Sequence, residues 1–111
     1  MKAVYIEKNG GPEVLTYGDF PDPTAEEGKI VVDIHAASIN GADWKVRQGG
    51  SYGEVPYFPY ILGRDFSGVV AEVGPGVTDF VRGDAVFGVL SREQAEDHCE
   101  EGARRAGIRA R

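Results

Sequence analysis

Glycine and proline break the apolar runs of this chain at short intervals, and this spacing limits the possible folds more than any other feature. The 111 residues include 16 glycines and 6 prolines, so the unbroken stretches are too short for a helical bundle. Short apolar runs between turns are typical of strands. The sequence therefore predicts one mainly β domain, and a chain of this length is expected to bury one compact core.

The clearest strand pattern lies in residues 29–38. Its apolar side chains recur with period two and share one face: Ile30, Val32, Ile34 and Ala36. Asp33 and His35 fall on the opposite face. We expect that face to be solvated, as in a sheet that is wet on one side.

A hairpin is predicted at the start of the chain. Residues 2–7 alternate between apolar and polar side chains, and residues 14–20 follow after Asn9-Gly10-Gly11-Pro12. Two adjacent glycines can adopt positive φ, as tight hairpin turns require. This turn is therefore able to hold positive φ, and we expect it to join two antiparallel strands in a hairpin.

Two further strands are predicted in the second half of the chain. Residues 61–73 form one long strand, in which Gly63 and Gly68 permit a bulge or a close approach of another backbone. Gly74-Pro75-Gly76 then turns the chain sharply, and residues 84–90 form the last strand.

A short helix is predicted between these strands. Asn40 is a suitable N-cap because its side chain can accept a hydrogen bond from a first-turn N–H, and Gly49 is placed to end the helix. Asp43 and Arg47 are spaced as an i, i+4 ion pair. Trp44, on the same segment, is expected to pack in the core or against a loop.

Two segments have no strand or helix period. Residues 50–60 gather three tyrosines, a phenylalanine and two prolines, which indicates a loop folded over an apolar surface. Residues 91–111 form a charged tail with almost no apolar stripe, so we expect it to be disordered or a frayed helix.

Charge and composition restrict the partners of the chain. Twelve basic and eighteen acidic residues give a formal net charge of −6, which disfavours nucleic acid and anionic membrane surfaces. No apolar stretch approaches the roughly 20 residues of a membrane span, and no apolar signal region is present. Because Cys99 is the only cysteine, an intrachain disulfide is excluded, and we expect a cytoplasmic location.

Three motifs follow one another in residues 1–90. They are the strand end and helix start at 37–49, with Asn40 and Asp43, the segment 61–70, and the turn and strand at 73–86. Together they resemble the N-terminal GroES-like catalytic domain of the medium-chain dehydrogenase/reductase superfamily, in its zinc-free quinone oxidoreductase (zeta-crystallin-like) branch. The resemblance implies a GroES-like, partly open β-barrel with one or two short helices.

The same resemblance indicates a site without metal. Zinc-dependent relatives place Cys, His and Glu where this chain has Asn40, Arg64 and Asp65. A fixed guanidinium cation in a ligand position opposes a dication, so no zinc is expected. His35 and His98 are expected to be surface histidines.

The resemblance further implies that NADPH and a quinone or carbonyl substrate occupy a cleft beside a Rossmann domain, and we expect that domain to be absent from the sequence given. Gly74-Pro75-Gly76 is the nearest candidate for a phosphate loop, but strand-like sequence follows it in place of a helix. We expect residues 1–90 to form the barrel. The change of character after Leu90 suggests a truncated or frame-shifted reading.

Three residues are candidates for the catalytic site. Asn40 can hydrogen-bond to substrate or to the nicotinamide, or serve as a helix N-cap, or do both. Asp43 can orient Asn40 or a water, although pairing with Arg47 is the simpler interpretation. Tyr52 falls where such relatives place a pocket tyrosine, but it can equally be a packing residue of the aromatic loop.

The predicted function is that of the catalytic-domain portion of a zinc-independent, NADPH-dependent oxidoreductase that reduces quinones or conjugated carbonyls. This fragment alone is expected to be inactive. Two alternatives remain open: a non-catalytic GroES-like interaction module, and a zinc-type alcohol dehydrogenase domain.

Overall fold

The computed structural model describes residues 1–50, 55, 57–90 and 107–110, the last four by their backbone. These residues form seven strands, one α-helix and one short 3₁₀ helix. In chain order they are β1 (Lys2–Ile6), η1 (Pro12–Val14), β2 (Leu15–Asp19), β3 (Ile30–Ala37), α1 (Gly41–Gln48), β4 (Tyr60–Ile61), β5 (Asp65–Val73), β6 (Ala85–Val89) and β7 (Gly107–Ala110).

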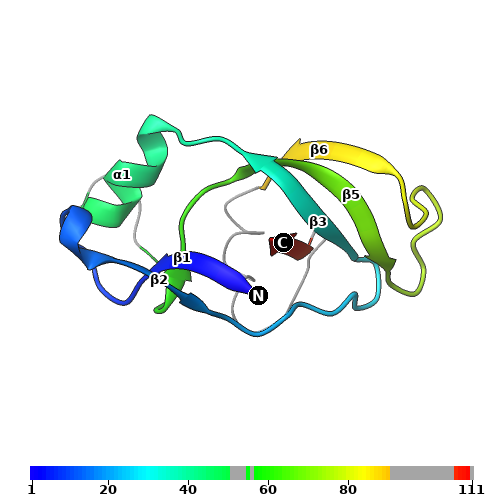
Figure 1. Ribbon diagram of the computed structural model, residues 1–111, viewed down its shortest axis with the longest axis horizontal. Coiled ribbons are helices and arrows are strands. Elements are labelled where there is room, and N and C mark those ends of the chain that lie inside the picture. The colour runs from blue at the N-terminus through cyan, green and yellow to red at the C-terminus, as the bar shows by residue number, and fades with distance from the viewer. Residues whose placement is uncertain (51–54, 56, 91–106, 111) are drawn as a thin grey trace.

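The strands form two sheets, and the described residues close no barrel. The first sheet has the order β2-β1-β4, and the second has the order β6-β5-β3-β7. Every pairing is antiparallel except that of β3 with β7. The two sheets lie along the long axis, with α1 near the end that carries β1 and β2 (Figure 1). The predicted mainly β, partly open architecture with a short helix is therefore confirmed.

The N-terminal hairpin has the predicted strands but a different turn. β1 pairs with β2 from Lys2 opposite Asp19 to Ile6 opposite Leu15. The turn does not use the positive φ that its glycines allow, because Gly11 has a φ of −78° and η1 follows it. Proline presets the backbone near −65°, so Pro12 starts a 3₁₀ turn at this point.

The expectation of one compact core is wrong, because each sheet buries its own apolar cluster. Ile6, Val14 and Tyr60 form the cluster of the first sheet. A second cluster packs beneath the second sheet: Ile30, Val32 and Val70. An apolar face must be covered by another element, and two short sheets that do not stack face to face bury two separate faces.

Strand β3 is covered on both faces over its first half. Asp33, which we predicted to be solvated, is only 8% exposed. The prediction fails because β3 lies between β5 and β7, as a central strand whose buried half need not alternate. His35, near the end of the strand, is exposed as predicted.

The segment predicted as one strand over residues 61–73 is two strands in different sheets. β4 pairs with β1, and β5 pairs with β3. Between β4 and β5 the chain turns at Gly63, whose φ of 101° is a conformation that favours glycine. The predicted close approach at Gly68 is confirmed, because a Cβ there would lie 2.0 Å from the carbonyl oxygen of Asp33.

Helix α1 begins and ends where the sequence predicts. Asn40 is its N-cap, and Gly49, with a φ of 80°, is its C-cap. Trp44 is 47% exposed, so its predicted core packing is wrong. Its packing against a loop stays a prediction, because residues 51–54 and 56 lie outside the described residues. The helix has no fully buried residue, which leaves this indole near solvent beside Lys45, whose Nζ lies 5.7 Å from the ring centroid.

The tail contains one element that the sequence does not predict. Gly107–Ala110 forms β7, which pairs in parallel with β3 from Val31 to Ile34. After β3 pairs with β5, its other edge still offers backbone N–H and C=O groups. Any short extended segment can satisfy these groups, so the pairing needs no apolar pattern in the tail.

Candidate functional site

The polar groups of the site meet where β3 ends, α1 begins and β5 begins. Ser38 follows β3, Asn40 caps α1, and Asp65 is the first residue of β5. Asp65 Oδ2 accepts a hydrogen bond from Asn40 Nδ2 at 2.6 Å and from Ser38 Oγ at 2.6 Å. Asn40 Nδ2 also lies 3.3 Å from Ser38 Oγ. We call these three residues the polar triangle.

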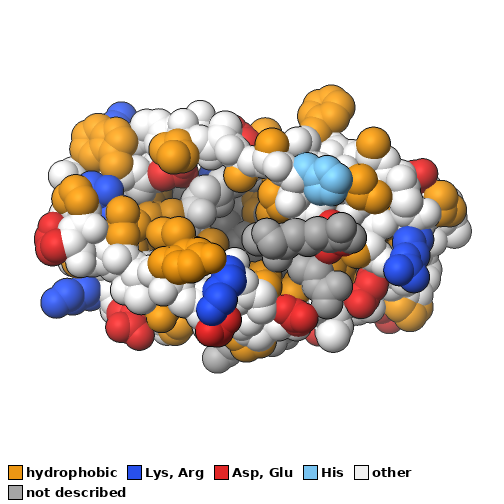
Figure 2. All heavy atoms as spheres, viewed as in Figure 1, with side chains coloured by type: hydrophobic (Ala, Val, Ile, Leu, Met, Phe, Trp, Pro, Cys, Tyr) orange, Lys and Arg blue, Asp and Glu red, His pale blue; other side chains and the backbone are white. Residues whose placement is uncertain are grey.

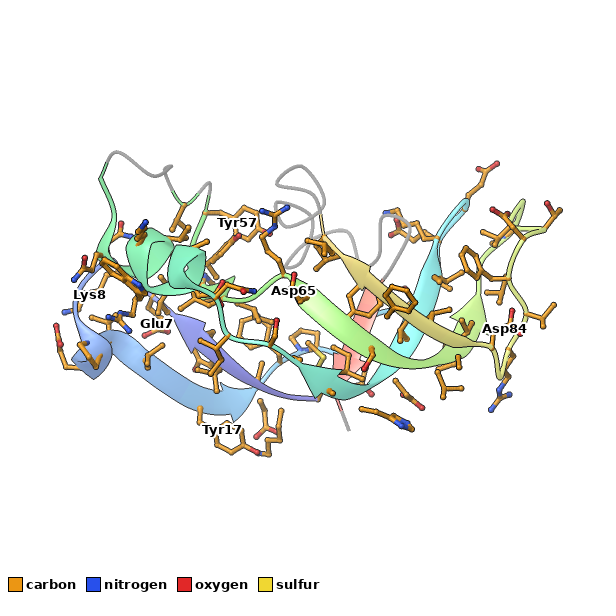
Figure 3. All side chains as sticks on the ribbon, turned by 90° about the horizontal axis from the view of Figure 1, so that it is seen from above. Glu7, Lys8, Tyr17, Tyr57, Asp65 and Asp84 are labelled. Atoms are coloured by element: carbon orange, nitrogen blue, oxygen red, sulfur yellow. The ribbon has the colours of Figure 1, made fainter. Side chains whose placement is uncertain are left out.

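The position of the polar triangle follows from the register of β3 and β5. Ala37 lies opposite Phe66 at the end of the ladder, so the residues just beyond each strand approach one another. Figure 3 shows Asp65 at the start of β5, next to α1 and far from Asp84. Twenty-five residues of chain therefore separate two side chains that are in direct contact.

Asp43 holds the backbone of Asn40. Its Oδ2 accepts a hydrogen bond from the Asn40 backbone N–H at 2.9 Å, in a capping-box arrangement. The predicted ion pair of Asp43 with Arg47 is not among the salt bridges of the described residues. The Arg47 guanidinium instead donates from Nε to the carbonyl of Gly10 at 3.3 Å, because the N-terminal loop packs against the helix end.

Hydrogen bonds keep the carboxyl group of Asp65 ionised. The donor hydroxyl of Ser38 and the donor amide of Asn40 lower the pKa of Asp65 below its ordinary value of 3.8. The nearby charge of Arg64 acts in the same direction, against a small opposing effect of desolvation. Asp65 is therefore an acceptor-only carboxylate at neutral pH.

The Arg64 side chain binds the backbone just after β6. Its Nε donates to the carbonyl oxygen of Leu90 at 2.6 Å, and the Leu90 N–H donates to the Arg64 carbonyl at 2.9 Å. Leu90 is almost fully buried. The guanidinium therefore anchors the segment after β6, and its charge also lowers the pKa of neighbouring Asp65.

Aromatic residues of the 50–60 segment pack toward the same end of the molecule. Tyr57 packs against the first apolar cluster, and its ring lies 5.9 Å from that of buried Tyr60. Figure 3 shows Tyr57 near α1, on the side from which β5 starts. Val55 and Tyr57 thus pack on the apolar surface of the first sheet, while residues 51–54 and 56 of the predicted loop lie outside the described residues. Tyr52, the predicted pocket tyrosine, lies outside the described residues.

Exposed hydrophobic side chains gather over the half of the molecule that carries α1 and β1, on the face seen in Figure 2. Trp44 and Ile39 belong to the exposed hydrophobic residues, and they flank the cap of the helix in sequence. The polar triangle is thus an exposed polar group with apolar neighbours along the chain.

The described residues hold no cluster of three or more His, Cys, Asp or Glu side chains that could bind a metal ion. Within the same part of the chain, no helix is long and apolar enough to cross a membrane. The polar triangle offers one carboxylate, one hydroxyl and one amide, and the amide nitrogen donates to the carboxylate and to the hydroxyl oxygen.

Two members of the polar triangle were missed as functional residues by the sequence prediction. Ser38 was not considered, and Asp65 was considered only as the residue in a zinc-ligand position. No local pattern connects Asp65 to Asn40, because their contact depends on how β5 pairs with β3. The only available signal was that the resemblance places both residues in positions that converge on one metal in zinc-dependent relatives.

The fold and the site together define a class of protein. Its members are mainly β domains with two sheets, a capped helix between strands and a polar site at that cap. The chain belongs to the alcohol dehydrogenase GroES-like domain family, whose profile matches residues 26–109. The predicted family is therefore confirmed.

Quinone oxidoreductases are prominent among its relatives. Quinone oxidoreductase of Rattus norvegicus is 35% identical over 88 residues, which cover 78% of this chain and 26% of the relative. The solved quinone oxidoreductase of Coxiella burnetii is 36% identical with a TM-score of 0.76, covering 85% of this chain and 31% of that structure. The Escherichia coli quinone oxidoreductase complexed with NADPH is 34% identical with a TM-score of 0.73, covering 78% and 26%.

The chain thus spans about a quarter of the length of the curated relatives it matches. What it shares with them is the region that contains the polar triangle, because the family match runs through Ser38, Asn40 and Asp65. The likeness therefore concerns the GroES-like catalytic domain of these oxidoreductases.

Proposed function

We propose that the chain is the catalytic-domain portion of a zinc-independent, NADPH-dependent oxidoreductase that reduces quinones or conjugated carbonyls. The observation that carries the proposal is the polar triangle, in which the Asn40 amide is held by Asp65 and Ser38 at the cap of α1. The similarity in sequence and structure to quinone oxidoreductases also supports the proposal.

The cofactor would supply a hydride to the electron-poor carbonyl or quinone. The chain's own task would be to orient reactants, since no activated nucleophile is required for such a transfer. Asn40 would contact the reactants, and Asp43 would hold the backbone of Asn40 through the 2.9 Å hydrogen bond from its N–H. Tyr52 remains in the proposal as a residue that would stack on a planar substrate.

The described residues suit the nicotinamide end of NADPH better than its phosphates. Gly74-Pro75-Gly76 turns the chain, but the Gly74 N–H donates to the carbonyl oxygen of Lys29 at 2.8 Å. A Cβ on Gly74 would lie 1.7 Å from the carbonyl oxygen of Glu26, so protein backbone already fills that space. The Gly74 backbone N–H is therefore not available to a phosphate, and Asn40 is the residue through which the chain would hold the cofactor.

Zinc independence is part of the proposal for a chemical reason. Zinc binds thiolates, imidazoles and carboxylates, whereas at the polar triangle the one carboxylate already accepts hydrogen bonds from an amide and a hydroxyl. A zinc-type alcohol dehydrogenase domain would instead hold stoichiometric metal. Elemental analysis of protein purified without chelator distinguishes the two, and we expect less than about one zinc per ten chains.

Binding of NADPH tests the main proposal. We expect addition of millimolar NADPH to shift the backbone amide resonances of residues 38–43, which include the N-cap of α1. Asn40→Ala should lower the affinity, whereas Asp19→Asn, on β2 in the other sheet, should leave it unchanged. Binding that Asn40→Ala leaves intact, or no binding at all, would contradict the proposal.

One observation favours a second candidate, a non-catalytic interaction module. β6 is an edge strand, and Phe87 on it is 89% exposed next to exposed Val89. An edge strand with large exposed apolar side chains can pair with another chain. This candidate replaces the first under two conditions. NADPH does not bind the chain, and a partner protein binds the wild type but not Phe87→Lys.

A further inference from the structure

We infer that Asn40 serves the site as a hydrogen-bond acceptor, and that Asp65 is the positioning residue that makes it one. The inference rests on the proposed function for the identity of the ligand. It goes further by stating which atom of Asn40 is available, which kind of ligand atom that atom can bind, and which neighbour determines this.

The chemistry of Asp65 decides which way the Asn40 amide points. An ionised carboxylate only accepts hydrogen bonds, so the amide atom 2.6 Å from Asp65 Oδ2 is the nitrogen and not the oxygen. The opposite orientation would place two oxygens, both acceptors, at that distance. The orientation is therefore a consequence of charge.

Ser38 engages the same nitrogen. The hydroxyl of Ser38 donates its single hydrogen to Asp65 Oδ2 at 2.6 Å, so its oxygen is left to accept from Asn40 Nδ2 at 3.3 Å. A side-chain amide has two N–H hydrogens. One is directed to Asp65 and the other to Ser38, and the donors of Asn40 are thereby committed inside the protein.

The amide oxygen is the group that remains for a ligand. It carries two lone pairs, so it can face the helix N-terminus as a cap and still accept one further hydrogen bond. The backbone of Asn40 is itself held by Asp43, so the residue cannot easily turn its nitrogen outward. A quinone or ketone oxygen is an acceptor and does not suit this atom.

The ligand atom that suits Asn40 Oδ1 is therefore an N–H or O–H donor. In NADPH such donors are the carboxamide N–H of the nicotinamide and the ribose hydroxyls. Asn40 would thus hold the cofactor and not the oxygen of the substrate. A reduced 3-acetylpyridine analogue of NADPH, which lacks the carboxamide N–H, separates these two sources. It binds like NADPH if a hydroxyl is the donor and more weakly if the carboxamide is.

An exchange of the two side chains tests the direction of the hydrogen bond. Asn40→Asp alone places two carboxylates in contact, and we expect about a tenfold loss of NADPH affinity, measured by NMR titration. The double variant Asn40→Asp with Asp65→Asn reverses every bond of the polar triangle. It still presents an acceptor oxygen at position 40 and keeps the net charge of the wild type.

We expect the double variant to recover affinity to within about threefold of the wild type. Recovery supports the acceptor role. Affinity as low as that of Asn40→Asp alone overturns it, because the exchange retains an acceptor at position 40 and removes the amide donor. Asp19→Asn is the matched control, since Asp19 is also an exposed carboxylate with a lowered pKa, in contact with Lys2 in the other sheet.

The side-chain amide resonances of Asn40 provide a readout that does not depend on NADPH. We expect the proton signal of the N–H that faces Asp65 to lie downfield of its position in a free asparagine amide in the wild type and in Asp19→Asn, and to return toward that position in Asp65→Ala, with an unchanged circular dichroism spectrum. Signals that Asp65→Ala leaves in place would overturn the positioning role of Asp65. If NADPH does not bind the wild type, the proposed function and the acceptor role both fail, while these signals still decide the orientation of the amide.

Discussion

Replacing Gly68 by alanine should destabilise the chain more than any other single methyl addition to the second sheet. Gly68 is buried on β5, opposite Ile34 of β3. A Cβ there would lie 2.0 Å from the carbonyl oxygen of Asp33 and 2.9 Å from its carbonyl carbon. Both atoms belong to the backbone, so no side-chain rotation can relieve the contact.

The cost follows from what must move. An ordinary van der Waals contact needs at least 3.4 Å, so β5 must shift away from β3 by more than 1 Å at this point. Such a shift weakens one or two ladder hydrogen bonds, at about 1 kcal/mol each. Overpacking of the buried neighbours adds about 1–3 kcal/mol, so we expect a total of about 3 kcal/mol.

Urea denaturation followed by far-ultraviolet circular dichroism measures this value. With a slope of about 1.5 kcal/mol per molar urea for a domain of this size, the midpoint should fall by about 2 M. Gly88→Ala is the matched comparison on neighbouring β6, where the nearest atoms, at 3.1 and 3.2 Å, belong to the movable ring of Phe66. We expect Gly88→Ala to cost less than about 1 kcal/mol. Equal midpoints for the two variants would refute the argument from backbone contact.

Three further predictions concern other parts of the molecule. Val32→Ala should lower the free energy of unfolding by about 2 kcal/mol in the same urea assay, because Val32 is fully buried in the second cluster. Gly49→Ala should lower the melting temperature, since its φ of 80° is strained for alanine and its Cβ would lie 3.0 Å from Asn9 Cγ; an unchanged melting temperature would contradict this. The pKa of Asp65 is lowered in the folded chain, so its contribution to stability should be complete above the ordinary pKa of 3.8 and be lost as the pH falls through the lower folded value. Asp65→Asn should remove this part of the acid dependence of stability, and a pKa at or above 3.8 in a carbon-detected NMR titration would show that the hydrogen bonds from Ser38 and Asn40 do not hold the carboxylate.

Local patterns predicted the elements of the site well. The helix cap at Asn40 and the C-cap at Gly49 were predicted because capping depends on residues within one turn of each other. The close approach at Gly68 was predicted because only glycine tolerates it. The chemistry of Asn40 stays a prediction, whereas the parts of Ser38 and Asp65 at this cap were not predicted, because both depend on contacts across 25 or more positions of the chain.

The failures have the same physical origin. The buried Asp33 and the two separate apolar clusters depend on which elements cover which faces, and period-two alternation carries no information on that point. The break between β4 and β5 was missed because a glycine in an apolar run is equally compatible with a bulge inside a strand and with a turn between strands.

The sequence by itself determined the mainly β class, the hairpin partners, the limits of α1 and the membership of the family, because each of these depends on short-range pattern or on motifs in a given order. Only the tertiary structure decided that Asp65 lies 2.6 Å from the amide of Asn40 and thereby which end of that amide faces outward. The reason is that strand pairing brings distant residues together, and the direction of a hydrogen bond is determined by the charge of the group that pairing places beside it.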